Sequence, residues 1–214
     1  MRYRTILVGA AIAALYTACG SVAVPSERFY RLAAPAPAEP DPSRGGVLRV
    51  QDLQLSTALD SDCLMRQHGV LLEPRPLARW IAPLDRLVTD ALVLGLSRAR
   101  VCDLVKGAAD PGGEDWALRG RIIDFAEVLD VAGARARVTL ELWLEVDGRM
   151  VFHDEFVAER ELTGSSAEAA VDGLSGALQE VAEELILRMR ARDLFAVARA
   201  RTDRSDAPAA SPPR

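Results

Sequence analysis

This chain has no excess of basic residues. Its 214 residues include 26 Lys and Arg against 31 Asp and Glu, a formal net charge of −5. Without the first 18 residues, which carry Arg2 and Arg4, 24 basic residues face 31 acidic ones, and the net charge is −7. Nucleic-acid binding depends on cationic side chains that neutralise phosphates, so the balance argues against nucleic acid as a partner. Every basic residue except Lys106 is arginine, which we interpret as genomic composition bias.

Residues suited to catalysis or metal binding are also few. The two histidines, His68 and His153, lie far apart in the sequence, and neither has a metal-ligand spacing. No glycine-rich phosphate loop follows an expected strand, and no serine occupies a strand-turn-helix elbow. No spacing places two carboxylates on one surface among the candidates Asp103, Asp124, Glu127 and Asp130. The sequence therefore predicts no cofactor and no metal, and it favours a protein that is not an enzyme.

No apolar run is long enough to span a membrane, which takes roughly 20 residues. Residues 6–18 form a short apolar segment that follows Arg2 and Arg4 and ends in small residues before Cys19. This layout is typical of a bacterial lipoprotein signal, in which the segment before the cysteine is removed and the thiol receives lipid. We therefore expect Cys19 to be lipidated. Ordinary secretion without lipid and a retained anchor are the alternatives.

The chain divides into four expected segments. These are a signal peptide (residues 1–18), a tether (19–28), one domain (29–195) and a disordered tail (196–214). About 180 residues suffice for one domain with a normal hydrophobic core. The tail contains prolines, small residues and charges, and has too little apolar surface to order itself.

Apart from Cys19, the chain contains the cysteines Cys63 and Cys102. Disulfides persist outside the cytoplasm, so this even pair predicts one disulfide. The bond would close a loop of about 40 residues and stabilise the fold by roughly 4 kcal/mol in the chain-entropy model. The alternative is two separate buried thiols, because free cysteine packs as a small hydrophobe.

The first part of the domain is expected to be mostly strands. Residues 29–32 form a short strand-like run, and the proline-rich residues 33–42 form an extended connector. Residues 47–55 are apolar enough for a buried strand with an irregular end. Residues 64–72 predict a hairpin that turns at His68-Gly69.

A helix is expected next. Pro74 and Pro76 should end the second arm of the hairpin, and residues 79–84 should start the helix, with Pro83 in its first turn. A strand over residues 101–105 follows, so the order strand, helix, strand implies one parallel crossover. The helix should bury a stripe made of Leu84, Leu87, Val88, Ala91, Leu92 and Gly95.

The second part of the domain reads as an antiparallel meander followed by a long helix. Apolar and polar residues alternate over residues 116–122 and 138–146, and Asp147-Gly148 is a preferred hairpin turn before a strand over residues 149–159. Residues 165–168 form a capping box that should start the helix. The apolar stripe of that helix is Val171, Leu174, Leu178, Val181, Leu185 and Met189. The predicted fold is α/β, a mixed sheet with one parallel crossover, a meander and a C-terminal helix packed on it.

Two tryptophans are candidate contact residues. Alternation places Trp143 on the face opposite Leu142 and Leu144. If a helix covers that face, Trp143 is ordinary core, which is the outcome we expect. If the face is open, Trp143 is a candidate contact with a partner or a lipid chain. Trp80, near the expected helix start, has the same two interpretations, and packing is again the one we favour.

One run of features resembles a known family. Cys19 is followed by Phe29-Tyr30-Arg31-Leu32, then by Val47-Leu48-Arg49-Val50, and then by Arg79-Trp80-Ile81-Ala82-Pro83-Leu84 with its amphipathic helix. This order resembles the ABC-type transport auxiliary lipoprotein family, which includes lipoproteins of the paraquat-inducible protein C type. The resemblance covers residues 29–194.

The resemblance implies an accessory subunit of an envelope lipid-transport system, without catalysis of its own. In such systems an ABC-type or related inner-membrane component works with periplasm-spanning proteins that carry mammalian cell entry (MCE) domains. The lipoprotein docks their far end at the outer membrane. Gly20, in place of a retaining aspartate, points by analogy to the outer membrane facing the periplasm. A phospholipid carrier and an envelope hydrolase using His68 or His153 are the rival hypotheses.

Overall fold

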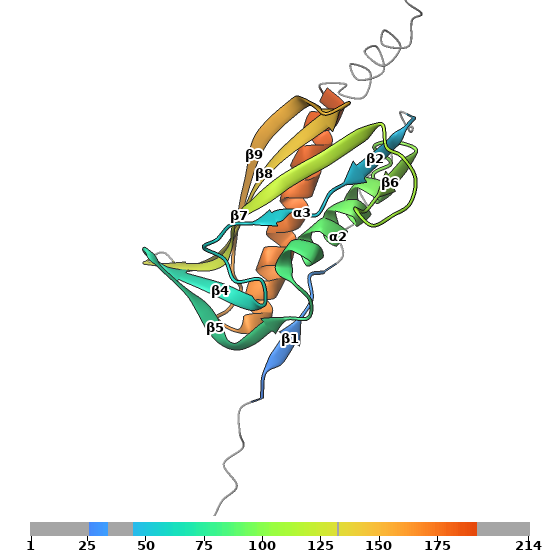
Figure 1. Ribbon diagram of the computed structural model, residues 1–214. Helices are drawn as coiled ribbons and strands as arrows, with labels where there is room; N and C mark the ends of the chain where they lie inside the picture. Colours follow the sequence, from blue (N-terminus) through green and yellow to red (C-terminus); the bar gives the residue numbers. More distant parts are fainter. Residues whose placement is uncertain (1–25, 34–44, 132, 192–214) are drawn as a thin grey trace, which may run out of the picture.

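The computed structural model describes residues 26–33, 45–131 and 133–191, which form a mixed sheet of nine strands with two helices (Figure 1). Helices α2 and α3 contact each other and cover one face of the sheet. The expected signal peptide, Cys19, most of the proline connector and the expected tail lie outside the described residues. The strands are β1 Arg28–Tyr30, β2 Val47–Val50, β3 Gln54–Leu55, β4 Cys63–His68, β5 Leu71–Trp80, β6 Leu104–Lys106, β7 Trp116–Asp130, β8 Gly133–Val146 and β9 Arg149–Glu161.

Strand β7 organises the sheet. Along one edge it pairs in turn with β2, β3 and β4, all parallel to it, and along the other edge it pairs with antiparallel β8. The predicted strand over residues 47–55 is therefore the pair β2 and β3, and its irregular end is the break between them. Because three short strands share one long neighbour, the chain from β2 to β4 moves along the length of β7.

The antiparallel meander of β7, β8 and β9 confirms the prediction from alternation. Leu140, Leu142 and Leu144 are fully buried toward the helices, whereas the residues between them are half-buried. Asp147 and Gly148 have φ values of 49° and 70°, the backbone conformation that a two-residue turn of the primed type requires. The turn residues and the period of two therefore specify this half of the sheet.

Helix α2 (Leu84–Arg98) begins later than expected. Residues 79–80 end β5 instead, and that strand runs through Pro74 and Pro76, which we expected to stop it. Only residues 78–80 of β5 pair with β1, so residues 71–77 have one edge without a strand partner. Proline is tolerated in such an edge strand because its missing N–H costs no ladder hydrogen bond there.

The parallel crossover connects β2 and β6, which pair side by side and lie on either side of α2 in the sequence. Strand β5, which directly precedes α2, is antiparallel to β4 and therefore runs opposite to β6. The mixed α/β fold with a long C-terminal helix is confirmed. The predicted stripe of α2 is buried except for half-buried Leu87.

Helix α3 (Ala167–Ala191) packs on β8 and β9 and buries every residue of its predicted stripe. Its cap differs from the prediction. The Ser166 hydroxyl accepts a hydrogen bond from the backbone N–H of Ala169 at 3.1 Å, so Ser166 is the N-cap. Glu168 bonds Arg28 and Tyr30 of β1 through its carboxylate.

The predicted disulfide is not formed, because Cys63 and Cys102 are free thiols. Cys63 lies near the start of α2, where the Leu84 N–H donates to the Ser61 carbonyl at 2.8 Å. Cys102 follows the other end of α2 and is buried. A helix of 15 residues is roughly 22 Å long. That separation far exceeds the reach of a disulfide, so the second interpretation, two separate thiols, describes this structure.

Helices long and apolar enough to cross a bilayer do not occur within residues 26–33, 45–131 and 133–191.

Candidate functional site

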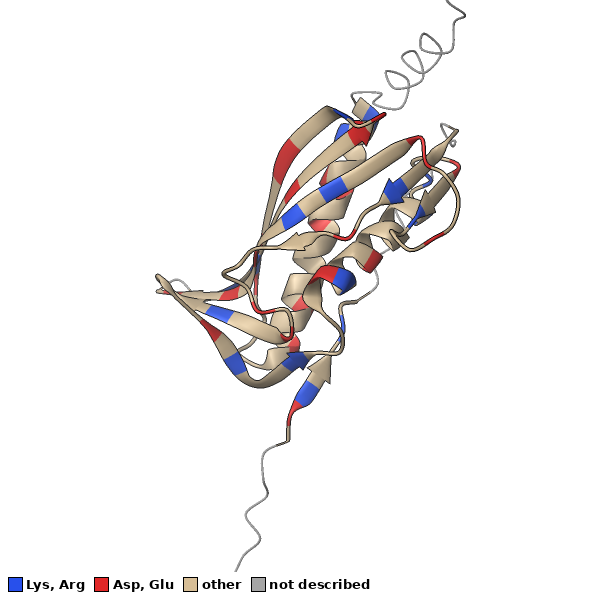
Figure 2. Cartoon of the chain, viewed as in Figure 1, with Lys and Arg blue, Asp and Glu red and all other residues tan. Residues whose placement is uncertain are grey.

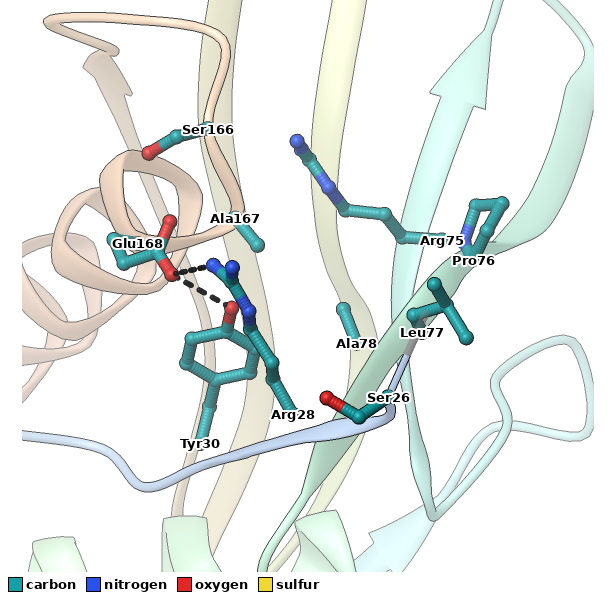
Figure 3. A pocket seen from close by; sticks show the side chains of 10 residues that line it. All are labelled: Ser26, Arg28, Tyr30, Arg75, Pro76, Leu77, Ala78, Ser166, Ala167 and Glu168. Atoms are coloured by element: carbon teal, nitrogen blue, oxygen red, sulfur yellow. Dashed lines mark hydrogen bonds and ion pairs between the residues drawn. The ribbon is translucent and has the colours of Figure 1, made fainter. Parts of the chain in front are cut away.

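Strand β1 lies against the body of the domain and forms one wall of a cavity of about 530 Å³ (Figure 3). The cavity is lined by residues of β1, of β5 and of the start of α3. Strand β1 is the first described element after the expected tether. This cavity therefore lies where the segment from Cys19 meets the domain.

Glu168 fastens β1 to α3. The Arg28 guanidinium donates to the Glu168 carboxylate at 3.0 Å, and the Tyr30 hydroxyl donates to the same oxygen at 2.9 Å (Figure 3). The backbone N–H of Glu168, Tyr30 and the Ser166 hydroxyl together lower the pKa of this carboxyl to about 2, with a further contribution from Arg28. The carboxylate is therefore charged across the physiological pH range and holds two side chains of β1.

The chain after β1 is also fixed to α3. The backbone N–H of Ala33 donates to the Ser175 hydroxyl at 3.0 Å, about two helical turns beyond Glu168. Three parallel register pairs with β5 complete the attachment of β1. Because β1 is bonded both to the sheet and to α3, it is an integral part of the domain.

A buried ion cluster lies at the inner side of the cavity. The Arg75 guanidinium donates to Glu127 at 2.5 Å and to the carbonyl of Ser165 at 2.6 Å. Arg66 donates to the same Glu127 oxygen at 2.9 Å, and the Glu127 side chain is 0% exposed. The cluster thus joins β4, β5, β7 and the loop before α3. Its polar groups therefore hold these four parts of the domain together.

We expect stability to depend on the Glu168 carboxylate between pH of about 4.5 and 2. Its lowered pKa in the fold means that it stabilises the folded state above the unfolded pKa, and that this contribution is lost as pH falls through that window. Glu168→Gln should therefore be less stable than wild type at pH 7, and the difference should close on acidification. Thermal unfolding against pH measures it, with Glu183→Gln on the same helix as control. A difference that stays constant from pH 7 to pH 2 would contradict this role.

Trp80, predicted to pack, is buried at the end of β5. Its ring meets Phe125 edge to face, with centroids 5.9 Å apart. Its indole N–H is buried without a hydrogen-bond partner in the described part of the chain. The packing interpretation is confirmed for Trp80, and its position on a strand explains why the expected helix start was wrong.

Trp143 is half-buried on the sheet face opposite the helices, so the expectation that a helix covers it was wrong. Its indole N–H donates to Glu145 at 3.1 Å, and its ring meets His153 edge to face. Charged residues of both signs surround it, with arginines on β7 beside glutamates on β8 (Figure 2). Its role as a contact residue stays a prediction.

The two histidines are placed differently from what the hydrolase hypothesis requires. His153 bonds the Glu141 carboxylate at 2.9 Å, and His68 is exposed at the end of β4. In the described part of the chain, neither histidine is hydrogen-bonded to a serine or cysteine. Within residues 26–33, 45–131 and 133–191, no group of three His, Cys, Asp or Glu side chains is arranged to hold a metal ion.

Sequence reasoning missed a loop organised around a buried arginine. Arg49 on β2 is 6% exposed and donates to Glu114 at 3.0 Å. It also donates to four carbonyls of the loop after β6, and Lys106 donates to two more. The loop acceptors of Arg49 are Gly107, Ala108, Asp110 and Gly112. Arg49 lies in an apolar strand, which is the one signal that marked it.

The space between the sheet and α3 bears on the carrier hypothesis, which needs a cavity there. Phe125, Leu140, Leu142 and Leu174 occupy this space and belong to one continuous buried cluster. The cavity under β1 is instead a surface feature with charged walls. The described residues therefore fill the layer where a carrier would hold an acyl chain.

Comparison with known proteins gives a family and a fold. The family model of the ABC-type transport auxiliary lipoprotein component matches residues 30–186. The chain is similar to a DUF330 protein from Xanthomonas campestris, with 20% identity, a TM-score of 0.65 and coverage of 74% of this chain and 92% of that chain. A second solved structure, an uncharacterized protein, has 17% identity, a TM-score of 0.64 and coverage of 77% and 99%. At these identities the structures show a shared fold alone. No curated protein matches the chain.

Proposed function

Because the chain belongs to the ABC-type transport auxiliary lipoprotein family, we propose that it is a lipid-anchored accessory subunit of an intermembrane lipid-transport system. In this proposal Cys19 carries the lipid, the outer membrane holds the protein, and the domain faces the periplasm. The domain docks the far end of a periplasm-spanning MCE protein whose inner-membrane component is of the ABC type or related to it. It performs no catalysis itself.

The family match from Tyr30 onward carries the proposal. Tyr30 is the β1 residue that bonds Glu168, so the matched domain begins at the strand that follows the expected tether. A lipoprotein signal that ends at Cys19 supplies the anchor in the same chain. An anchor followed directly by a docked strand is the arrangement that an envelope-bound accessory subunit needs.

A lipid anchor also makes a modest docking surface sufficient. Several acyl chains hold a protein firmly on a membrane, whereas one chain gives marginal binding. Tethering raises the effective concentration of the domain near a partner in the same envelope. The charged open face around Trp143 is the surface that we propose for this docking, because both signs of charge are available there for a complementary partner.

The proposal is tested by fatty-acid labelling and by affinity purification from detergent-solubilised envelope. Wild type should carry the label and should recover an MCE protein. Cys19→Ala should lose the label completely and recover at least about tenfold less MCE protein, because the raised effective concentration is lost.

Cys63→Ala is the matched control, since it removes a thiol of the domain and should keep both label and partner. Labelled protein that recovers no MCE protein, under conditions that preserve a known complex of this type, would remove the partner from the proposal. An unlabelled wild type would remove the anchor.

A further inference from the structure

Two hairpin turns meet at one end of the sheet. Strand β4 is parallel to β7, with Gln67 beside Val128 and His68 beside Leu129. The turn between β4 and β5 therefore lies next to the turn between β7 and β8, and the two form one projecting end of the molecule (Figure 1). We call this end, made of Val70, Leu71 and Val131, the apolar tip.

The apolar tip exposes valines fully. The exposed fractions are 105% for Val70 and 109% for Val131, and Leu71 beside them is 55% exposed. Gly69, with a φ of 57°, provides the turn conformation, and the residue after it usually is polar in a turn of this kind. Two adjacent turns with valine at their ends therefore depart from local preference, and such departures mark functional positions.

Two polar side chains at the base of the apolar tip have partners. Asp130, which ends β7, forms an ion pair with Arg135 and accepts a hydrogen bond from the Gly133 N–H at 3.1 Å. Gln67 donates to the carbonyl of Gly69 at 2.8 Å. Because these polar groups already have partners, the tip can leave water at a lower cost than a tip with an unpaired carboxylate.

The expected tether is long enough to bring Cys19 near the apolar tip. Strand β1 begins at Arg28 beside Ala78, in the same strand β5 that begins at Leu71 of the tip. The distance along β5 from Leu71 to Ala78 is roughly 23 Å. The nine residues from Cys19 to Arg28 span at most about 30 Å. The lipid-bearing sulfur can therefore reach the level of the tip.

We propose that the apolar tip inserts into the surface of the bilayer that holds the acyl chains of Cys19. This proposal rests on the proposed lipid anchor. The anchor brings the domain to the membrane, and insertion of the tip fixes its orientation there. A protein held at two separate points of the bilayer cannot rotate freely about its tether, so its docking surface keeps one direction.

The test uses the full lipidated protein in vesicles of phosphatidylethanolamine and phosphatidylglycerol with brominated acyl chains, which quench tryptophan near the bromine. Val70→Trp and Val131→Trp each place the probe at the tip. Val157→Trp on β9 is the control away from the tip, since Val157 is also an exposed valine. An apolar group at an interface enters to roughly 5–10 Å, so bromine near the headgroup should quench the added tip fluorescence by about half.

Fluorescence from Val157→Trp should stay unchanged between brominated and ordinary vesicles. Equal fluorescence of the tip variants in the two kinds of vesicle, while the lipidated protein floats with the vesicles, would overturn tip insertion and leave the lipid anchor intact. This outcome would also be the result if the tip contacts a protein partner instead. Failure of the wild type to carry lipid or to float would overturn the anchor itself.

Discussion

Glu127→Ala is expected to lower the free energy of unfolding by roughly 3–5 kcal/mol. The substitution removes the buried carboxylate that balances the positive charges of two arginines. The Glu127 side chain is 0% exposed, and Arg66 and Arg75 are 23% and 12% exposed. Removal of the shared carboxylate forces both guanidinium groups to find water or to stay unpaired. Thermal unfolding followed by circular dichroism should show a midpoint lower by roughly 10 °C.

Glu159→Ala is the control for this prediction. Glu159 pairs with Arg137 at 2.5 Å on the same sheet, but both side chains are about one third exposed, at 33% and 28%. Surface ion pairs contribute about 0–1 kcal/mol, so this variant should stay close to wild type. Equal destabilisation by the two substitutions would show that burial of Glu127 does not determine its contribution.

Arg49→Met is expected to release the loop after β6 and to cost at least about 2 kcal/mol, since hydrogen bonds to a charged group are lost together. Methionine keeps most of the stem of arginine but donates no hydrogen bond. Four loop carbonyls and Glu114 lose their donor in the variant. Hydrogen exchange should accelerate at the backbone amides of Gly107 and Asp110, which are bonded within this loop.

Arg119→Met tests whether any arginine on this sheet has the same effect. Arg119 is 45% exposed and donates to Glu145 at 2.8 Å, so its loss should cost less than about 1 kcal/mol. It should also leave exchange in the loop unchanged. Unaltered exchange at Gly107 in Arg49→Met would mean that the loop is held by Lys106 and its own turns.

Periodic patterns predicted the elements that repeat over many residues. The stripe of α3 and the alternation of β8 are local in the sequence, so each position supports the same assignment. The error at β5 came from applying the proline rule without knowing which edge of the strand lacks a partner. Edge position is a property of the assembled sheet, and no local pattern contains it.

The candidate site depends on contacts between distant segments. Glu168 bonds Arg28 and Tyr30 across 140 and 138 positions, and Arg66 meets Glu127 across 61. The sequence contained a capping signal near Glu168, but it did not indicate that Glu168 bonds residues of β1. A signal for Glu127 did exist, because it is a charged residue within the apolar run Phe125-Ala126-Glu127-Val128-Leu129. A charge in a buried strand indicates a buried partner and does not identify it.

The disulfide prediction failed for a related reason. An even number of cysteines in an oxidising compartment makes a pair possible, but it contains no distance. Helix α2 separates the two cysteines. Only the assembled fold shows that Cys63 lies near the start of this helix and Cys102 after its end. Arginine composition was equally uninformative, because a bias in codon usage and a buried arginine such as Arg49 produce the same count.

The parallel pairing of β1 with β5 would determine how the domain responds to force from the proposed anchor. Tension along the axis of β1 would load its hydrogen bonds to β5 in shear, so that these bonds share the strain. A strand pulled perpendicular to its axis would instead open one bond at a time. The Glu168 and Ser175 contacts attach the same segment to α3 as well. Although β1 has only three residues, its pairing with β5 would resist being pulled along the strand axis.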